Sequence, residues 1–218
     1  GALAHAYGAI FVVDTTSTYA MRPINIKNDN IDFCMASAQK GLMAMTGISF
    51  VVGKRTIIEQ SKTYPKRSYY CNLYMQYHYF EAHGEMHFTP PVQTVYAMRQ
   101  AIKEYFAEGE QKKWERHTRV FEALHKGIER LGFQNIIKRD WQAGLVVTVK
   151  YPDDPNWSFS AIHDYCYKRG FTIYPGKINN TETFRLCALG AIDQSDIETF
   201  FEVFEAGLRD CLLYTSPS

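Results

Sequence analysis

Several features are scarce or missing in this chain of 218 residues, and each absence excludes a class of protein. No apolar run approaches the roughly 18 to 20 residues that a membrane helix needs, because the run at residues 10–13 ends at once in Asp14. The net charge is only +1, and no stripe of Lys and Arg offers a footprint for DNA or RNA. We therefore expect neither a membrane nor a nucleic acid as a partner.

Cysteine is also sparse, and its pattern argues against disulfides and zinc. The five cysteines are odd in number, widely spaced and include no C-x-x-C pair, which fits a reducing, cytoplasmic environment. The nearest approach to a metal-binding pattern is His78 and His83, but these are five residues apart, whereas zinc on a helix requires a spacing of four. We expect no metal site. No signal peptide is visible, although the chain lacks an initiator Met.

With 46% hydrophobic and 22% charged residues, the composition is that of a globular protein with room for one large domain or one and a half. Short apolar strands alternate with amphipathic helices, which indicates an α/β fold. Strands are expected at residues 9–13, 31–36 and 48–52, and the last two are continuous apolar runs, typical of strands buried on both faces. Helices are expected from residue 90 to about 109 and from about 111 to 132.

After residue 132 the pattern changes to a smaller α+β unit. Strands are expected at residues 133–137, 145–149, 171–174 and 184–187, and helices at 158–168 and from 193. The predicted domains are residues 1–108 and 109–210, and residues 211–218 are a non-native-looking tail without periodicity. The first residues look like the end of a helix, so the chain is expected to begin within a domain.

Two residues follow apolar strands at positions where α/β proteins bind ligands. Asp14 ends the first strand, and in an open α/β sheet ligands bind beyond the carboxyl ends of the strands. The structural alternative is an Asp that caps the next turn. Lys40 follows the strand at residues 31–36 among small residues, a placement suited to Schiff-base chemistry because desolvation favours the free amine. Its alternative is a solvated loop lysine.

Arg185 interrupts an otherwise apolar strand, so it needs a partner. Its rigid guanidinium suits a carboxylate or a phosphonate, and an unseen Asp or Glu of the same chain is the alternative.

Five motifs in order link these features to a known family. They are Val12-Val13-Asp14, Ser37-Ala38-Gln39-Lys40, Phe88-Thr89-Pro90-Pro91, Ile173-Tyr174-Pro175-Gly176-Lys177 and Phe184-Arg185. With these motifs, the chain from about residue 8 to about residue 208 resembles the class V aminotransferase group of fold-type I pyridoxal-phosphate enzymes. The resemblance implies that residues 1–108 are the C-terminal part of the large cofactor-binding domain, with a mostly parallel sheet covered by helices, and that 109–210 are the small α+β domain.

The resemblance also implies roles for individual residues. Lys40 would hold pyridoxal 5'-phosphate as a Schiff base and move the proton, and Asp14 would pair with the pyridinium nitrogen. Gln39 and Ser37 would bind the cofactor phosphate, although both could equally be turn residues. Thr89 matches a threonine that reaches the phosphate in the neighbouring subunit, which implies a homodimer. The family's phosphate cup and stacking aromatic ring are missing here, so these residues alone are expected to show weak or no activity.

Arg185 matches the arginine that binds the anionic end of the substrate, and Lys177 is a weaker candidate nearby. Within the family, the last two motifs are most similar to those of aminotransferases that move the amino group of 2-aminoethylphosphonate to pyruvate, giving phosphonoacetaldehyde and alanine. An alanine:glyoxylate or serine:pyruvate type aminotransferase is the alternative in the same fold. A non-catalytic dimerising fragment is the alternative from another class, but it predicts loss of Lys40 or Asp14, and both are present.

Overall fold

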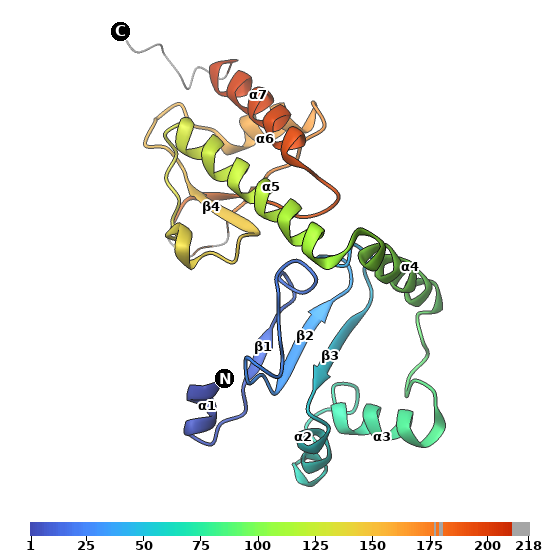
Figure 1. The fold of residues 1–218 in the computed structure, drawn as a ribbon. Coiled ribbons are helices and arrows are strands. Elements are labelled where there is room, and N and C mark those ends of the chain that lie inside the picture. Colours follow the sequence, from blue (N-terminus) through green and yellow to red (C-terminus); the bar gives the residue numbers. More distant parts are fainter. Residues whose placement is uncertain (177, 179–180, 211–218) are drawn as a thin grey trace. The chain divides into compact units, whose positions relative to one another are not determined.

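The computed structural model describes residues 1–176, 178 and 181–210, and these fall into two compact units, Gly1–Glu110 and Gln111–Ser218. Figure 1 shows the helices and strands of both units. The division lies two residues beyond the boundary expected from the sequence, and the domain roles given above stay predictions. The tail expected at residues 211–218, like Lys177, lies outside the described residues.

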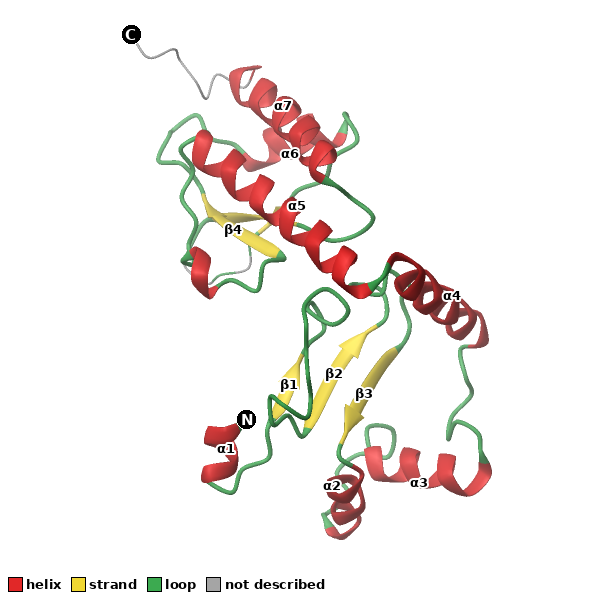
Figure 2. Ribbon diagram, in the orientation of Figure 1, coloured by secondary structure: helices red, strands yellow, loops and turns green. Residues whose placement is uncertain are grey.

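The first unit is a small mixed sheet with helices around it (Figure 2). In chain order its elements are α1 (Ala2–Ala6), β1 (Val12–Asp14), β2 (Phe33–Ser37), β3 (Ser49–Gly53), α2 (Arg55–Gln60), η1 (Ser61–Thr63), α3 (Leu73–His83) and α4 (Val92–Glu108). Strands β1 and β2 are parallel, whereas β3 returns antiparallel to β2. An antiparallel return needs no crossover helix, and residues 38–48 contain none. Only β1 and β2 therefore have their carboxyl ends at the same edge.

Burial in this sheet differs from the expectation of strands buried on both faces. Side chains alternate along β2, so that Cys34 and Ala36 are buried whereas Met35 is 37% exposed. Met35 pairs with Val51 of β3, which is 39% exposed on the same face. The expectation is wrong here because the apolar run does not show which face the neighbouring elements cover.

A buried carboxylate, Asp32, ties the start of β2 to three other segments. Its side chain is 3% exposed, and it accepts hydrogen bonds from Lys54 Nζ at 2.6 Å, His5 Nε2 at 2.8 Å and the backbone N–H of Phe11 at 2.7 Å. These interactions, led by the bond from Lys54, hold the pKa of Asp32 well below its usual range. The charged form is thus the one that the folded state stabilises.

We expect the first unit to lose stability in acid through Asp32. Because the folded-state pKa is lowered, the contribution is fully present above the unfolded pKa of about 4 and is lost as the pH falls through the folded pKa. Asp32→Asn should therefore be less stable than the wild type at pH 7, and the difference should shrink below pH about 4. Denaturant unfolding at a series of pH values checks this. Asp29→Asn, an exposed neighbour, is the control, and an equal pH dependence in both variants would contradict the assignment.

The second unit packs helices on a three-stranded antiparallel sheet of order β4-β6-β5. Its elements are α5 (Glu110–Arg130), which begins at the boundary, η2 (Arg139–Trp141), β4 (Val146–Lys150), α6 (Phe159–Tyr167), β5 (Tyr174–Pro175), β6 (Thr183–Cys187) and α7 (Gln194–Asp210). The strand expected at residues 133–137 is only an isolated bridge between Asn135 and Val149. One face of the sheet and the apolar faces of α5, α6 and α7 form the core. None of the helices in the described part of the chain is long and apolar enough to cross a membrane.

Candidate functional site

Asp14 lies at the end of β1 and is exposed. Its Oδ1 accepts a hydrogen bond from the backbone N–H of Thr16 at 2.8 Å, so it does cap the turn that follows. The hydrogen bonds from Thr16 lower the pKa of Asp14, burial opposes them, and the positive charge of Lys40 adds the smallest lowering effect. Asp14 therefore stays ionised at neutral pH, and it does so within the electrostatic reach of Lys40.

Lys40 lies three residues beyond β2 and is half-buried. Its Nζ donates a hydrogen bond to Ser17 Oγ at 2.9 Å. Ser17 belongs to the loop after β1, so parallel pairing of β1 and β2 brings the two loops to one edge of the sheet. This arrangement differs from the solvated loop lysine considered above, because the amine has a defined partner 23 residues earlier in the chain.

Two buried contacts hold these loops together. Thr15 is 2% exposed, and its hydroxyl donates to the carbonyl oxygen of Met35 at 2.8 Å, which joins the end of β1 to β2. Gly41, directly after the lysine, packs so closely on the loop after β1 that any Cβ atom there would collide with the carbonyl oxygen of Tyr19. A side chain at Gly41 would therefore push the two loops apart. Neither Ser17 nor Gly41 was predicted from the sequence, although the hydroxyl run at residues 15–18 and the Lys-Gly pair are visible signals.

The three predicted phosphate ligands are placed differently. The Ser37 side-chain oxygen, at the end of β2, is buried and lacks among the described residues the hydrogen-bond partner that a buried hydroxyl usually has. Gln39 is exposed in the turn before Lys40. Thr89 is exposed before α4, and no hydrogen bond among the described residues links it to Lys40, Asp14 or Ser37. The structure thus brings Asp14, Ser37 and Lys40 to one edge, and Thr89 stays a prediction.

Arg185 belongs to the second unit, in the middle of β6. It is half-buried, and its Nε donates to the carbonyl oxygen of Pro175 in β5 at 3.1 Å. Among residues 1–176, 178 and 181–210, no Asp or Glu forms an ion pair with it. The alternative of a carboxylate partner within the chain finds no support there, and the terminal nitrogens suit an anionic ligand.

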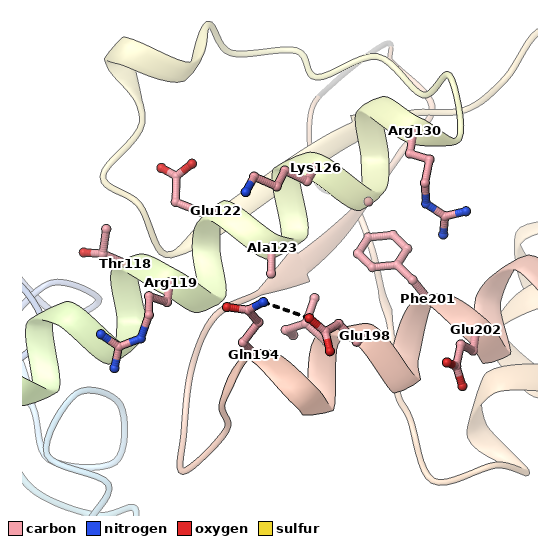
Figure 3. Close-up of a pocket in the computed structure, with 12 residues that line it drawn as sticks. Thr118, Arg119, Glu122, Ala123, Lys126, Arg130, Gln194, Glu198, Phe201 and Glu202 are labelled. Atoms are coloured by element: carbon pink, nitrogen blue, oxygen red, sulfur yellow. Dashed lines mark hydrogen bonds between the residues drawn. The ribbon is translucent and has the colours of Figure 1, made fainter.

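A separate groove of about 570 Å³ lies between α5 and α7 (Figure 3). Ala123, Gly127, Ile197 and Phe201 supply its apolar part. Charged residues line it from both helices, such as Lys126 of α5 and Glu198 of α7, whose carboxylate accepts a hydrogen bond from Gln194 at 2.8 Å. None of the residues predicted from the sequence to form the site lines this groove.

The residues at the edge of the first sheet fit pyridoxal phosphate chemically. A lysine amine, an ionised carboxylate and a buried hydroxyl without a described partner match the aldehyde, the protonated ring nitrogen and the phosphate of that cofactor. Within the described part of the chain, no group of three or more His, Cys, Asp or Glu is arranged to hold a metal ion.

Comparison with known proteins defines the class. The family model "Aminotransferase class-V" matches residues 1–176, and the chain belongs to this family. The resemblance seen in the sequence motifs is thereby confirmed at the level of the family.

Curated relatives carry a more particular name. The chain is 33% identical over 197 residues to "2-aminoethylphosphonate--pyruvate transaminase 2" of Paraburkholderia xenovorans, which covers 90% of this chain and 53% of the relative. It is 32% identical over 199 residues to "2-aminoethylphosphonate--pyruvate transaminase" of Salmonella typhimurium, covering 90% of this chain and 54% of the relative. The chain thus spans about half the length of these relatives.

Solved structures share the fold. An alanine–glyoxylate aminotransferase from Nostoc sp. superposes with a TM-score of 0.83 at 22% identity, over 95% of this chain and 56% of that structure. An aspartate aminotransferase from Thermus thermophilus superposes with a TM-score of 0.81 at 21% identity, over 96% of this chain and 60% of that structure. The expected fold-type I architecture is therefore confirmed.

Proposed function

We propose that the whole protein carrying this chain is a pyridoxal-phosphate-dependent transaminase that moves the amino group of 2-aminoethylphosphonate to pyruvate, giving phosphonoacetaldehyde and alanine. The observation that carries the proposal is the identity of 31–33% to proteins named for this reaction, over about nine-tenths of the chain. The positions of Lys40 and Asp14 at one sheet edge support it. Residues 1–218 alone are expected to have weak or no activity.

Lys40 and Asp14 would carry the chemistry of the amino transfer. When bound, pyridoxal phosphate accepts the electron pair left on a carbon that loses its proton. Lys40 Nζ takes that proton from one carbon and returns it to another, acting as a general base and then as a general acid. Asp14, kept ionised by Thr16 and Lys40, holds the proton on the ring nitrogen. Ser17 would orient the amine of Lys40 when that amine is free.

Ser37, Gln39 and Thr89 would bind the cofactor phosphate, with Thr89 reaching it from the partner in a homodimer.

The segment before Thr89 supports an interface between subunits. None of the residues of α3 is buried, and Tyr70 and Phe80 are 66% and 53% exposed. Exposed aromatic side chains of this kind are enriched at protein interfaces. The described cysteines, Cys34, Cys71, Cys166 and Cys187, form no disulfide, which supports a reducing compartment such as the cytoplasm.

Arg185 would bind the anionic group of both substrates in turn. A phosphonate and a carboxylate each offer two oxygens to the guanidinium, so one arginine serves both halves of the reaction. Because the first product leaves before pyruvate binds, the steady-state kinetics should be ping-pong.

The test is the visible absorbance spectrum of the full-length protein with pyridoxal phosphate. We expect the band of the lysine-bound cofactor to disappear with 2-aminoethylphosphonate and to return with pyruvate. Alanine and serine are the comparison donors. If only alanine or serine discharges the band, the enzyme is of the alanine:glyoxylate or serine:pyruvate type. If no band forms at all, the reading as a non-catalytic dimerising protein replaces both.

A further inference from the structure

We propose that Tyr174 determines the preference for a phosphonate, by donating a hydrogen bond to the third oxygen of a phosphonate group held by Arg185. The inference rests on the proposed function, because it concerns the same anion site. It adds a residue to which the motif analysis assigned no role.

The register of the second sheet places Tyr174 beside Arg185. Tyr174 of β5 and Thr148 of β4 are the residues directly opposite Arg185 on its two sides. Directly opposed residues share a face of the sheet, with Cβ atoms about 4.5–5.5 Å apart. The adjacent residues of β6, Phe184 and Leu186, point to the other face and are buried in the core. The row of Thr148, Arg185 and Tyr174 therefore lies on the face away from the core.

The guanidinium is tied to the β5 side of this row. Arg185 Nε donates to the carbonyl oxygen of Pro175, the residue after Tyr174, at 3.1 Å. Its terminal nitrogens form no hydrogen bond or ion pair among the described residues. An anion bound by these two nitrogens would therefore lie on the side of β5, which carries Tyr174, and not on the side of β4, which carries Thr148.

Strand β5 is held firmly enough to position the phenol. The N–H of Gly176 donates to the carbonyl oxygen of Thr183 at 2.6 Å, and a Cβ atom at Gly176 would collide with the Thr183 side chain. The chain after Tyr174 therefore packs directly on β6, which only glycine permits. The Tyr174 side chain is 52% exposed, and no hydrogen bond of its hydroxyl is found within the described part of the chain.

A carboxylate and a phosphonate differ in the number of oxygens that need a hydrogen-bond donor. A carboxylate has two oxygens, and both are paired by the guanidinium. A phosphonate has a third, which would cost binding energy if it were desolvated without a donor. A phenol beside the guanidinium supplies that donor. A site that pairs a polar group of one substrate discriminates more strongly than one that merely accommodates it.

The experiment compares half-reactions of the full-length holoenzyme and its Tyr174→Phe variant. We expect kcat/KM for 2-aminoethylphosphonate to fall about 10- to 100-fold, the usual effect of losing a hydrogen bond to a charged group. The kcat/KM for alanine should change less than about threefold, because its carboxylate does not need the hydroxyl of Tyr174. Binding of the unreactive probes methylphosphonate and acetate, followed by the NMR signal of the Arg185 Nε–H, should show the same selectivity without turnover.

Two variants act as controls, and the outcomes separate the two proposals. Thr148→Val removes the hydroxyl on the other side of Arg185, and Tyr167→Phe removes one from the exposed face of α6; both should leave the phosphonate preference unchanged. Equal losses for phosphonate and carboxylate in Tyr174→Phe, no loss in either, or a larger effect of Thr148→Val would overturn the role of Tyr174. A wild-type enzyme that does not convert 2-aminoethylphosphonate would instead overturn the proposed function.

Discussion

Replacing Lys40 by Ala in the full-length protein should abolish both the visible absorbance of the lysine-bound cofactor and the transamination. In the proposed mechanism one amine supplies both the covalent attachment and the proton transfer, and the hydroxyl of Ser17, 2.9 Å from Lys40 Nζ in this structure, can replace neither. We expect a loss of about 10⁴-fold or more in the rate of the half-reaction, since proton transfer by a positioned group contributes up to about that factor. Stopped-flow absorbance with 2-aminoethylphosphonate measures it.

Lys40→Arg and Lys103→Ala make the comparison specific. Arginine keeps the positive charge near Asp14 but stays protonated, so Lys40→Arg should be as inactive as Lys40→Ala. Lys103 is exposed on α4, and its loss should leave the spectrum and the rate unchanged. If the absorbance band persists in Lys40→Ala, the attachment belongs to another lysine and the assignment of this site fails.

Phe184→Ala should be the most damaging single substitution for the fold of the second unit. Phe184 is 1% exposed, and its ring lies within 6.4 Å, centroid to centroid, of several other aromatic rings. These are the rings of Phe133, Tyr151, Trp157, Phe159 and Phe204. Removing a buried Phe side chain costs about 3–5 kcal/mol, because apolar contacts are lost and a cavity remains. That is a large part of the roughly 5–15 kcal/mol by which domains are stable.

Denaturant unfolding followed by tryptophan fluorescence checks this, because the Trp157 ring lies 5.8 Å from the Phe184 ring, centroid to centroid, and should report its environment. Tyr167→Ala is the matched control, since this aromatic side chain is 67% exposed on α6 and its loss should change the free energy of unfolding by less than about 0.5 kcal/mol. If Phe184→Ala lowers the free energy of unfolding by less than about 1.5 kcal/mol, the cluster of aromatic rings does not hold the unit together.

The sequence alone predicted the features that depend on local chemistry. The ends of β1 and β2 at Asp14 and Ser37 could be read from apolar runs that stop at polar residues, and the long helices α4 and α5 from their periodicity. The order and spacing of the motifs indicated the class V aminotransferase family, which the family comparison confirms. Each strand end, helix and motif is a short stretch of consecutive residues, so no knowledge of long-range contacts is needed to find it.

Other features depended on which segments meet in space. The antiparallel return of β3 and the exposure of Met35 and Val51 follow from strand pairing and from which face is covered, and an apolar run has the same letters in either case. The bridge at Asn135 shows the same limit, because the residues of 133–137 do not show how far this segment pairs with β4, and the structure has a single bridge, between Asn135 and Val149.

The candidate site likewise combines residues that the sequence predicted with contacts that only the tertiary structure shows. Sequence determined which residue types stand after the strands, and therefore that Lys40 and Asp14 were candidates. Tertiary structure alone decided that Lys40 reaches Ser17, that Gly41 packs on the backbone of Tyr19, and that Tyr174 stands beside Arg185. The physical reason is that hydrogen bonds and close packing act over a few ångströms, and only the folded backbone brings residues 11 to 23 positions apart within that range.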